Sequence, residues 1–312
     1  MTAISVIILS YNDFDGTTGL CLESLFADPA SAAWKVMVVD NASDELTRRK
    51  LKEAASRFPA VEIILNDANR GFSGGMNVGL RKSQSEVTAL LNSDTRVSMG
   101  MIEALANALT SDAKLGIVAP VSNAAGNEQK IFCSAESPDV ILKEGCAYAN
   151  AGPADVIPAY RLDFCGVAVT RQLIDQVNLL DEEFGRGYYE DFDYCIRARQ
   201  AGFNPSVVEN AFLYHQGGAS FSKVSHKTKE LLASNKKLLF QKHGTHIKMP
   251  HVRDGNLAVL AYYANLRHRG IEPSPIRLRS RLALAEAEIP RSLLKRIRYK
   301  SRLNRLKREL SD

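Results

Sequence analysis

Short apolar runs alternate with segments of helical periodicity along the first third of the chain. The apolar runs predict strands, and the segments in which apolar residues recur every three or four positions predict helices. The predicted strands are residues 4–9, 36–39, 61–65, 87–91 and 115–119. The predicted helices between them are residues 20–26, 46–58, 73–82 and 102–109. This alternation is typical of βαβ units, and it predicts an α/β fold with a mostly parallel sheet.

The pattern weakens between residues 121 and 161, where Ala, Asn, Gly and Pro are frequent. A connection of this length inside a compact domain is usually a functional lid, a binding loop or a disordered segment, and we expect one of these here. Beyond it, strands are predicted at 163–170 and 212–215, and helices at 171–177 and 191–201. From residue 225 the chain reads as helical, and its last segment, 292–310, predicts an imperfect amphipathic helix.

Polar side chains follow three of the predicted strands, around Asn12, Asp40 and Asp94. Because the carboxyl ends of parallel strands lie on one edge of a sheet, we expect these clusters to meet. A carboxylate such as Asp94 at that edge can hold a hard divalent cation against a diphosphate. Asn, Ser and Asp are also ordinary turn formers, so a simple turn at this position stays open.

Two further stretches carry candidate chemistry. The run from Asn69 to Asn77 is rich in glycine and begins a predicted helix, where close backbone approach and free amides favour phosphate. It is not a Gly-x-Gly-x-x-Gly fingerprint, which argues against a dehydrogenase. A second acidic cluster, with Glu190, Asp191 and Asp193, lies in the first turn of the helix predicted at 191–201, where the helix dipole stabilises carboxylates.

Composition narrows the class of protein. The 312 residues are 45% hydrophobic and 24% charged, as expected for a soluble globular chain with one large domain or one domain and an appendage. No apolar run approaches the roughly 18 residues of a membrane span. We expect no signal peptide, because the first strand begins without a basic n-region. Five scattered cysteines without a Cys-x-x-Cys pair predict free thiols in a reducing cytoplasm.

The net charge of +5 belongs to the C-terminal part of the chain. Residues 267–312 carry 14 Lys and Arg against 5 Asp and Glu, so the preceding residues are net acidic. A basic amphipathic helix there either lies on an anionic membrane or is a solvated face packed on the domain or on another subunit. Nucleic acid is a poorer candidate, because Tyr299 is the only aromatic residue of the final helix that offers stacking.

Taken in order, five motifs resemble family 2 glycosyltransferases, most of all the non-processive, rhamnosyltransferase-like and galactofuranosyltransferase-like members. The motifs are Tyr11-Asn12, Val38-Val39-Asp40-Asn41-Ala42-Ser43, Asn69-Arg70-Gly71-Phe72-Ser73-Gly74-Gly75-Met76-Asn77, Leu90-Leu91-Asn92-Ser93-Asp94 and Tyr188-Tyr189-Glu190-Asp191-Phe192-Asp193. The resemblance spans about residues 4–220. It implies a GT-A fold, a nucleotide-sugar donor, a divalent cation and inversion at the anomeric carbon. The Gln-x-x-Arg-Trp signature of processive, membrane-embedded synthases is absent, so we expect transfer of single sugars.

The resemblance also implies roles on the donor side. Asp40 matches the position that receives the pyrimidine ring N–H, and the run from Asn69 to Asn77 matches a loop and helix start near the donor. Asn92-Ser93-Asp94 matches the Asp-x-Asp metal motif with Asn92 in place of the first Asp, which leaves Asp94 as the direct metal ligand and Asn92 for ribose or a metal-bound water. His215 matches a histidine that completes the metal shell in several relatives, and an Asp/His shell fits Mg²⁺ or Mn²⁺.

On the acceptor side, Asp191 matches the catalytic base, which takes the proton of the attacking hydroxyl. For Glu190 and Asp193, a role in capping the helix and a role at the substrate stay open. Cys165-Gly166 matches a stretch that lines the acceptor side, with Cys165 itself expected to be buried and not a nucleophile. The predicted substrate-binding residues are Ser10, Tyr11, Asn12, Asp40, Asn69, Arg70, Gly71, Gly75, Asn77, Asn92, Ser93, Cys165, Gly166 and Glu190.

These inferences predict a GT-A catalytic domain at residues 1–224, with a nucleotide-sugar half at 1–120 and an acceptor half at 121–224, followed by a helical extension at 225–312. The expected activity is transfer from a UDP- or dTDP-linked sugar to a hydroxyl of a glycan or lipid-linked glycan, in polysaccharide biosynthesis for the cell envelope. The expected location is the cytoplasm, including the inner face of the membrane. The alternative is a catalytically weak nucleotide-binding scaffold that acts through its basic tail.

Overall fold

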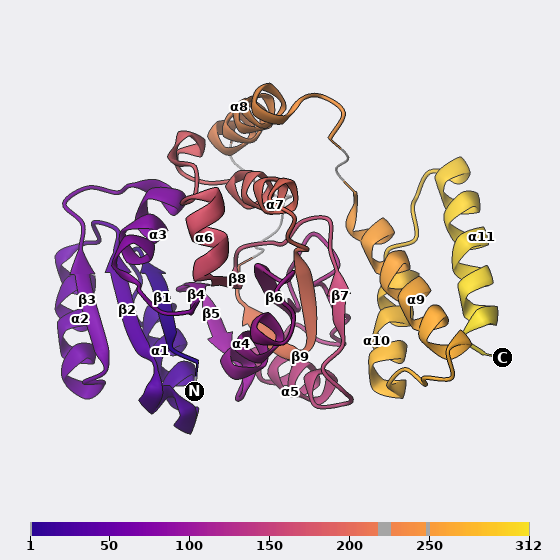
Figure 1. The fold of residues 1–312 in the computed structure, drawn as a ribbon, viewed down its shortest axis with the longest axis horizontal. Coiled ribbons are helices and arrows are strands. Elements are labelled where there is room, and N and C mark those ends of the chain that lie inside the picture. Colours follow the sequence, from indigo (N-terminus) through magenta and orange to yellow (C-terminus); the bar gives the residue numbers. More distant parts are fainter. Residues whose placement is uncertain (1, 218–225, 248–249, 312) are drawn as a thin grey trace.

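The computed structural model describes residues 2–217, 226–247 and 250–311, and it has the predicted α/β architecture (Figure 1). The strands are β1 (Ile4–Ser10), β2 (Lys35–Asp40), β3 (Val61–Leu65), β4 (Val87–Asn92), β5 (Thr95–Val97), β6 (Ile117–Ser122), β7 (Val156–Pro158), β8 (Gly166–Thr170) and β9 (Ser206–His215). The helices are α1 (Thr18–Phe26), α2 (Glu45–Arg57), α3 (Gly71–Lys82), α4 (Met101–Ser111), α5 (Pro138–Ala149), α6 (Arg171–Val177), α7 (Glu190–Gln200), α8 (His226–His243), α9 (Val252–His268), α10 (Pro275–Ala287) and α11 (Leu293–Glu309). Short 3₁₀ turns lie at Pro29–Ala33 and Glu182–Phe184.

One sheet in the order β3-β2-β1-β4-β8-β6-β9-β5 organises the molecule, with β7 paired to β9. The pairs among β3, β2, β1 and β4 are parallel, as predicted. Beyond β4 the sheet is mixed, because β8 runs antiparallel to both β4 and β6. The chain leaves β6 and enters β8 at the same edge of the sheet, which reverses β8. A connection through one helix, as between β1 and β2, instead returns the chain to the opposite edge.

Two apolar layers cover the sheet, one on each face. Alternate residues of β1 show the division: Ile7 packs with α3, whereas Val6 and Ile8 pack with α1 and α2. The helices α5, α6 and α7 complete the first layer, and α4 completes the second. Strands buried on both faces read as unbroken apolar runs, which explains why the sequence pattern located them.

The segment 121–161 is more ordered than the sequence indicated. It contains α5 and β7, and α5 packs on β9 so closely that a Cβ on Gly145 would lie 2.2 Å from the Phe212 ring. Disorder over this whole segment is therefore ruled out, whereas a role as a lid or binding loop stays a prediction. Gly145 weakens the helical pattern of the sequence. It is needed because the packing of α5 on β9 leaves no room for a side chain at this position.

The C-terminal helices divide into two groups. Helices α9, α10 and α11 surround a core of their own together with Ile157 of β7. Helix α8 instead packs on α7, where Leu239 contacts the cluster around Phe184 and Phe192. The predicted domain boundary between residues 224 and 225 lies outside the described residues. In the described part of the chain, every helix falls short of the length and apolarity that a membrane crossing requires.

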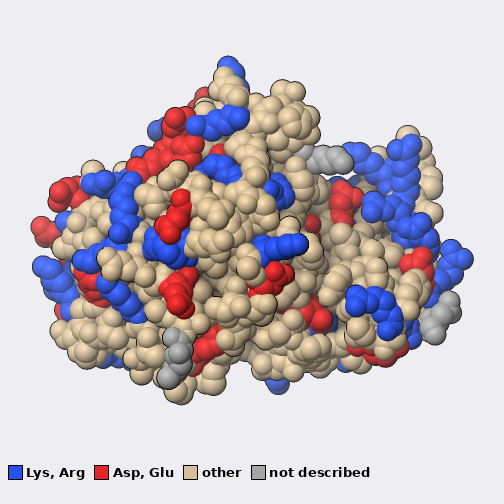
Figure 2. Space-filling view, in the orientation of Figure 1, with Lys and Arg blue, Asp and Glu red and all other residues tan. Residues whose placement is uncertain are grey.

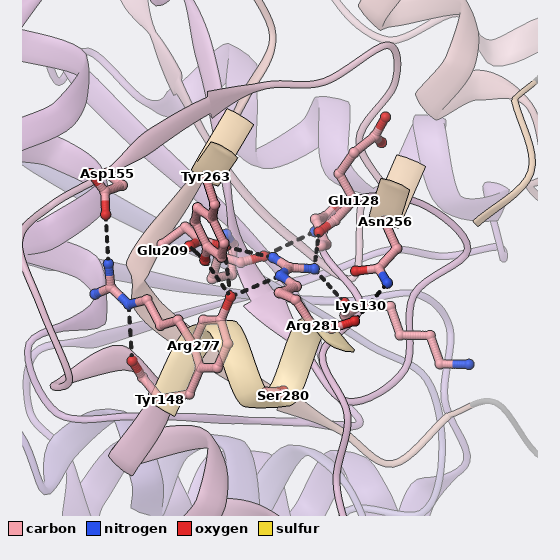
Figure 3. A network of polar contacts seen from close by, with 12 residues as sticks. Glu128, Lys130, Tyr148, Asp155, Glu209, Asn256, Tyr263, Arg277, Ser280 and Arg281 are labelled. Carbon is pink, nitrogen blue, oxygen red and sulfur yellow. Dashed lines mark hydrogen bonds and ion pairs between the residues drawn. The ribbon is translucent and has the colours of Figure 1, made fainter. Parts of the chain in front are cut away.

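A buried polar network joins α9 and α10 to the sheet (Figure 3). The fully buried Arg281 donates from Nη2 to Glu209 Oε1 of β9 at 2.6 Å and from Nε to the Tyr148 hydroxyl at 2.8 Å. The Tyr263 hydroxyl of α9 donates to the other oxygen of Glu209. Arg277, also fully buried, pairs with Asp155 at 3.0 Å. These charges compensate one another and tie α9 and α10 to the sheet, and α11 packs on them through the core that the three helices share.

Candidate active site

The polar clusters after β1, β2 and β4 lie together at the carboxyl edge of these strands, as the sequence predicted. The strands end level with one another, since Ser10 is paired with Asp40 and Leu9 with Asn92. The loops beyond them are also joined, because Asn12 donates its backbone N–H to Ser43 Oγ at 2.9 Å and its side-chain oxygen accepts from the Asp44 N–H at 3.0 Å.

Asp40 lies at the bottom of this edge and is fully buried. Its carboxylate accepts from the Ser43 N–H at 3.2 Å and from Arg48 Nε at 2.9 Å. Arg48 was not singled out by the sequence, since its role depends on how α2 returns toward β2. Of the other predicted residues here, Ser10 bonds to the Thr18 hydroxyl in the interior, whereas Tyr11 is 52% exposed at the rim.

The glycine-rich run forms the start of α3. Gly71 has a φ of +69°, and a Cβ there would lie 1.9 Å from the Gly185 carbonyl oxygen, so only glycine lets the helix start approach that loop. Asn69 accepts the Gly71 N–H through its side-chain oxygen at 2.9 Å, and Arg70 is exposed beside it. Gly75 packs against Leu9 of β1.

Asn77 has a different position from the one expected of a substrate-binding residue. It is 1% exposed, and its amide donates to Leu180 O at 2.9 Å and to Glu182 Oε1 at 2.8 Å. Its side-chain oxygen accepts the Leu180 N–H. Because these contacts use both ends of the amide, the structure shows Asn77 tying α3 to the segment before α7.

Asp94 and His215 are brought together by the pairing of β5 with β9, in which Thr95 lies opposite His215. The distance between His215 Nε2 and Asp94 Oδ2 is 3.3 Å. His215 Nδ1 lies 3.3 Å from the Ala124 carbonyl, which can only accept, so Nδ1 carries a proton and Nε2 faces Asp94. Asn123 binds the backbone N–H and carbonyl of His215 through its side-chain amide and so fixes the strand end.

The electrostatics of this pair suit a cation. Burial disfavours the charged imidazolium of His215, but its interactions with Asp94 and Cys165 together outweigh burial and raise the pKa of the imidazole to about 11. A divalent ion between the two side chains would replace that proton. A carboxylate and an imidazole are suitable ligands for Mg²⁺ or Mn²⁺. Within the ranges that the structure describes, no cluster of three or more His, Cys, Asp or Glu side chains forms a complete metal shell.

Cys165 and Gly166 lie next to this pair. Because β8 is antiparallel to β4, Gly166 at its start is paired with Leu91 near the end of β4, and the Cys165 carbonyl accepts the Asn92 N–H at 2.9 Å. Cys165 is 4% exposed, as expected for a buried thiol. The side chains of Asn92 and Ser93 are half-buried at the same edge.

The second acidic cluster follows a strained loop. Tyr188 and Tyr189 have φ values of 72° and 77°, a region that bulky side chains rarely occupy. Asn235 of α8, 4% exposed, donates to the carbonyls of Phe184, Gly187 and Tyr188 at 2.8–3.1 Å. Helix α8 therefore holds the loop that directs the first residues of α7.

Asp191 contacts a residue that the sequence did not single out. Its Oδ2 lies 3.6 Å from Arg161 Nη1, and Arg161 Nη2 lies 3.2 Å from Asp163. Burial raises the pKa of the Asp191 carboxyl to about 6, while the positive charge of Arg161 opposes that rise. Glu190 is 7% exposed, and burial together with the charge of Asp191 raises its pKa to about 8.

Asp193 has a structural role. Its two oxygens accept from Arg197 Nε at 2.8 Å and from His243 Nε2 at 2.7 Å, so it connects α7 to α8. Glu190 Oε2 is buried and has no hydrogen-bond partner among the described residues, which leaves it available to a ligand. The structure shows no side-chain capping bond at the start of α7, and a substrate role for Glu190 stays a prediction.

Segment 161–166 links the two acidic groups. Its end lies beside the Asp94 turn through β8, and its start reaches Asp191 through Arg161. Asp40 and Asp94 follow β2 and β4, which both pair in parallel with β1, and the loop before Asp191 lies against Gly71 at the start of α3. Sequence reasoning missed Arg161, Arg48 and Asn235 because their contacts with Asp191, Asp40 and the Phe184 carbonyl span 8 to 51 positions, separations that no local pattern marks.

The sequence of this chain is similar to a family model and to several known proteins. Residues 5–133 match the family model described as Glycosyl transferase family 2. An uncharacterized protein of Mycobacterium tuberculosis is 28% identical over 200 residues, which cover 62% of this chain and 68% of that protein. The low-salt glycan biosynthesis hexosyltransferase Agl10 of Haloferax volcanii is 25% identical over 214 residues, 64% of this chain and 63% of Agl10.

Two solved structures share the fold. The mannosyltransferase PcManGT from Pyrobaculum calidifontis, in complex with GDP-Man and Mn²⁺, aligns with a TM-score of 0.55 at 17% identity, over 99% of this chain and 87% of that one. GalNAc-T7 with UDP, GalNAc and Mn²⁺ aligns with a TM-score of 0.59 at 16% identity, over 77% of this chain but only about half of that one, 48%. Residues 5–133 therefore match the model of glycosyl transferase family 2, and the chain has the GT-A fold that its sequence predicted.

Proposed function

We propose that this protein is an inverting glycosyltransferase that moves a single sugar from a UDP- or dTDP-linked donor to a hydroxyl of a glycan or lipid-linked glycan. The observation that supports this most is a pair of acidic groups with different surroundings, joined by the segment 161–166. Asp94 lies against His215, while Asp191 lies against Arg161. One group suits a metal and the other suits a proton acceptor.

On the donor side, we assign the nucleotide to the loops after β1 and β2 and the diphosphate to the start of α3. Asp40 would accept the ring N–H of a pyrimidine in addition to its contacts with Ser43 and Arg48. Asp94 and His215 Nε2 would hold Mg²⁺ or Mn²⁺, and the bound cation would offset the charge that develops on the departing diphosphate. Both similar structures contain Mn²⁺, which supports a divalent cation here.

On the acceptor side, Asp191 would act as the general base. The acceptor oxygen forms a bond to the anomeric carbon, the bond from that carbon to the diphosphate oxygen breaks, and the hydroxyl proton passes to the Asp191 carboxylate. The nucleoside diphosphate leaves on the opposite side, so the anomeric configuration inverts. A pKa of about 6 keeps Asp191 ionised at neutral pH while leaving it basic enough to take a proton.

The test is a screen of nucleotide sugars, including UDP-, dTDP- and GDP-linked hexoses, for release of the nucleoside diphosphate with Mn²⁺ or Mg²⁺. We expect Asp191→Asn to lower turnover about 10²–10⁴-fold while nucleotide binding is unchanged. Asp175→Asn, at an exposed carboxylate of α6, is the matched control. Tight nucleotide binding without turnover by the unaltered protein would instead support the scaffold alternative, which Asn92 in the metal motif favours.

A further inference from the structure

Helix α11 carries two apolar faces. Tyr299, Leu303 and Leu306 are buried against α9. At about 100° per residue, Leu293, Leu294 and Ile297 lie on the side of the helix opposite to these. They are 62%, 72% and 57% exposed, although each is a large aliphatic side chain. Three exposed aliphatic side chains gathered in the first two turns of one helix form a surface patch that the fold itself does not use.

The cations around this patch differ from those further along the helix. Arg302, Arg305 and Lys307, in the second half of α11, pair with acidic side chains. In the first half, the structure shows no ion pair for any basic residue among those it describes. These exposed residues are Lys295, Arg296, Arg298 and Lys300, and Arg291 just before the helix is also exposed and without an ion pair in the described structure. Figure 2 shows Lys and Arg gathered at the end of the molecule that α9–α11 form.

This arrangement is unfavourable for the helix itself. The first turn of α11 has no acidic residue, and the N-cap Ser292 makes no side-chain capping bond. Cations near a helix N-terminus oppose the helix dipole, which favours negative charge there. Among the described residues, these cations make no ion pair and the apolar side chains beside them are mostly exposed, so together they suit a partner that is both anionic and apolar.

We infer that the first two turns of α11 dock this protein on an anionic lipid bilayer, with Leu293, Leu294 and Ile297 inserted at the interface and the surrounding cations on the lipid headgroups. Aliphatic insertion beside Lys and Arg is the chemistry of interfacial amphipathic helices. A second copy of this chain fits less well, because an isologous contact would place like charges against one another. Nucleic acid also fits less well, because Tyr299 is 6% exposed and cannot stack on a base.

The docking would also orient the molecule. The buried Arg281 ties α10 to Glu209 of the sheet, and Arg277 ties it to Asp155 before β7 (Figure 3). The core that α9, α10 and α11 share fixes α11 on these helices. The surface is therefore rigid with respect to the candidate active site, and binding would hold that site at a set distance from the bilayer. This inference does not depend on glycosyl transfer, since lipid binding is measured without a donor.

The experiment measures co-sedimentation of the full-length protein with vesicles of 70% phosphatidylcholine and 30% phosphatidylglycerol, and with pure phosphatidylcholine. Each Lys or Arg near an anionic surface contributes about fivefold to the binding affinity. The triple variant Lys295→Gln, Arg296→Gln and Arg298→Gln should therefore bind the anionic vesicles about a hundredfold more weakly. Replacing Leu293, Leu294 and Ile297 together by Ser should weaken it at least tenfold. Binding should be strong only on the anionic vesicles and should fall with added salt.

The matched control removes the same charge from the paired half of the helix, as Arg302→Gln, Arg305→Gln and Lys307→Gln, and should weaken binding much less. Thermal unfolding by circular dichroism verifies that each variant is folded. Equal loss in both charge variants, or binding that survives the Ser variant, would overturn the proposal. A concentration-dependent dimer abolished by the Ser variant without vesicle binding, or nucleic-acid binding that the Ser variant retains, would overturn it in favour of those partners.

Discussion

The contact between Arg161 and Asp191 predicts how catalysis should depend on pH. The two charged groups are 3.6 Å apart, with side-chain exposures of 26% and 15%. At an effective dielectric constant of about 20, this separation corresponds to roughly 4–5 kcal/mol of attraction. Asp163 neutralises part of the Arg161 charge, and an arginine beside an aspartate ordinarily lowers its pKa by about 1–3 units. Arg161 is thus the main reason that the buried Asp191 remains ionised near neutral pH.

Replacing Arg161 by Gln should raise the pKa of Asp191 from about 6 by about 1–3 units. Because the base works only when ionised, activity is present above this pKa and is lost as the pH falls through it. The acidic limb of the profile of kcat/KM against pH should therefore move upward, to about pH 8 for a shift of two units. At pH 7 the ionised fraction would fall from about nine tenths to about one tenth, a roughly tenfold loss that recovers at pH 9.

The assay is release of the nucleoside diphosphate from pH 5 to pH 9.5, at subsaturating donor. Arg161→Lys retains the positive charge, so the acidic limb of its kcat/KM profile should lie close to that of the unaltered protein. Arg57→Gln removes an exposed arginine that pairs with Glu23 on the surface and should leave the profile unchanged. If Arg161→Gln lowers activity equally at every pH, Arg161 does not act on the ionisation of Asp191, and the reasoning is refuted.

Three further changes test the supports of the site. Asn235→Ala removes the donor to three loop carbonyls, so we expect a loss of about 1–3 kcal/mol of stability and faster hydrogen exchange at residues 185–190, and unchanged exchange there would contradict the bracing role. Gly71→Ala combines a φ of +69° with a clash against Gly185, and chemical denaturation should show more than about 1 kcal/mol of destabilisation, whereas a stability equal to that of the unaltered protein would disprove the close approach. Arg281→Met leaves the charge of Glu209 uncompensated in the interior and should lower the free energy of unfolding by about 3–5 kcal/mol, and adding Glu209→Gln should recover part of that loss. A small effect of Arg281→Met alone would show that the network does not tie α10 to the sheet.

Sequence patterns located the elements whose burial is simple. Strand β1 is apolar on both faces, and the polar residues after it, after β2 and after β4 meet because the three strands are parallel neighbours. The juxtaposition of Asp94 with His215 was implied only by family resemblance, and the structure brings these two side chains within 3.3 Å.

Other features depend on contacts between distant segments. The sequence did not predict α5, because Gly145 interrupts its helical pattern. A glycine is needed there because the Phe212 ring leaves no room for a side chain. The antiparallel entry of β8 follows from a connection whose path no local signal describes. Arg161 lies in a stretch without periodicity, and its pairing with Asp191 exists only after both segments have folded. Asn77 resembled a ligand-binding residue by its position in a motif, but burial shows that its amide serves the fold.

The central claim is that Asp94, His215 and Asp191 serve one site, and a crystal structure with Mn²⁺ and a UDP- or dTDP-sugar tests it most directly. We expect an anomalous peak for Mn²⁺ bound by Asp94 and His215 Nε2 and by the diphosphate, with the Asp191 carboxylate facing the anomeric carbon from the opposite side. Mn²⁺ bound elsewhere, or Asp191 facing a pocket that the donor does not enter, would contradict it.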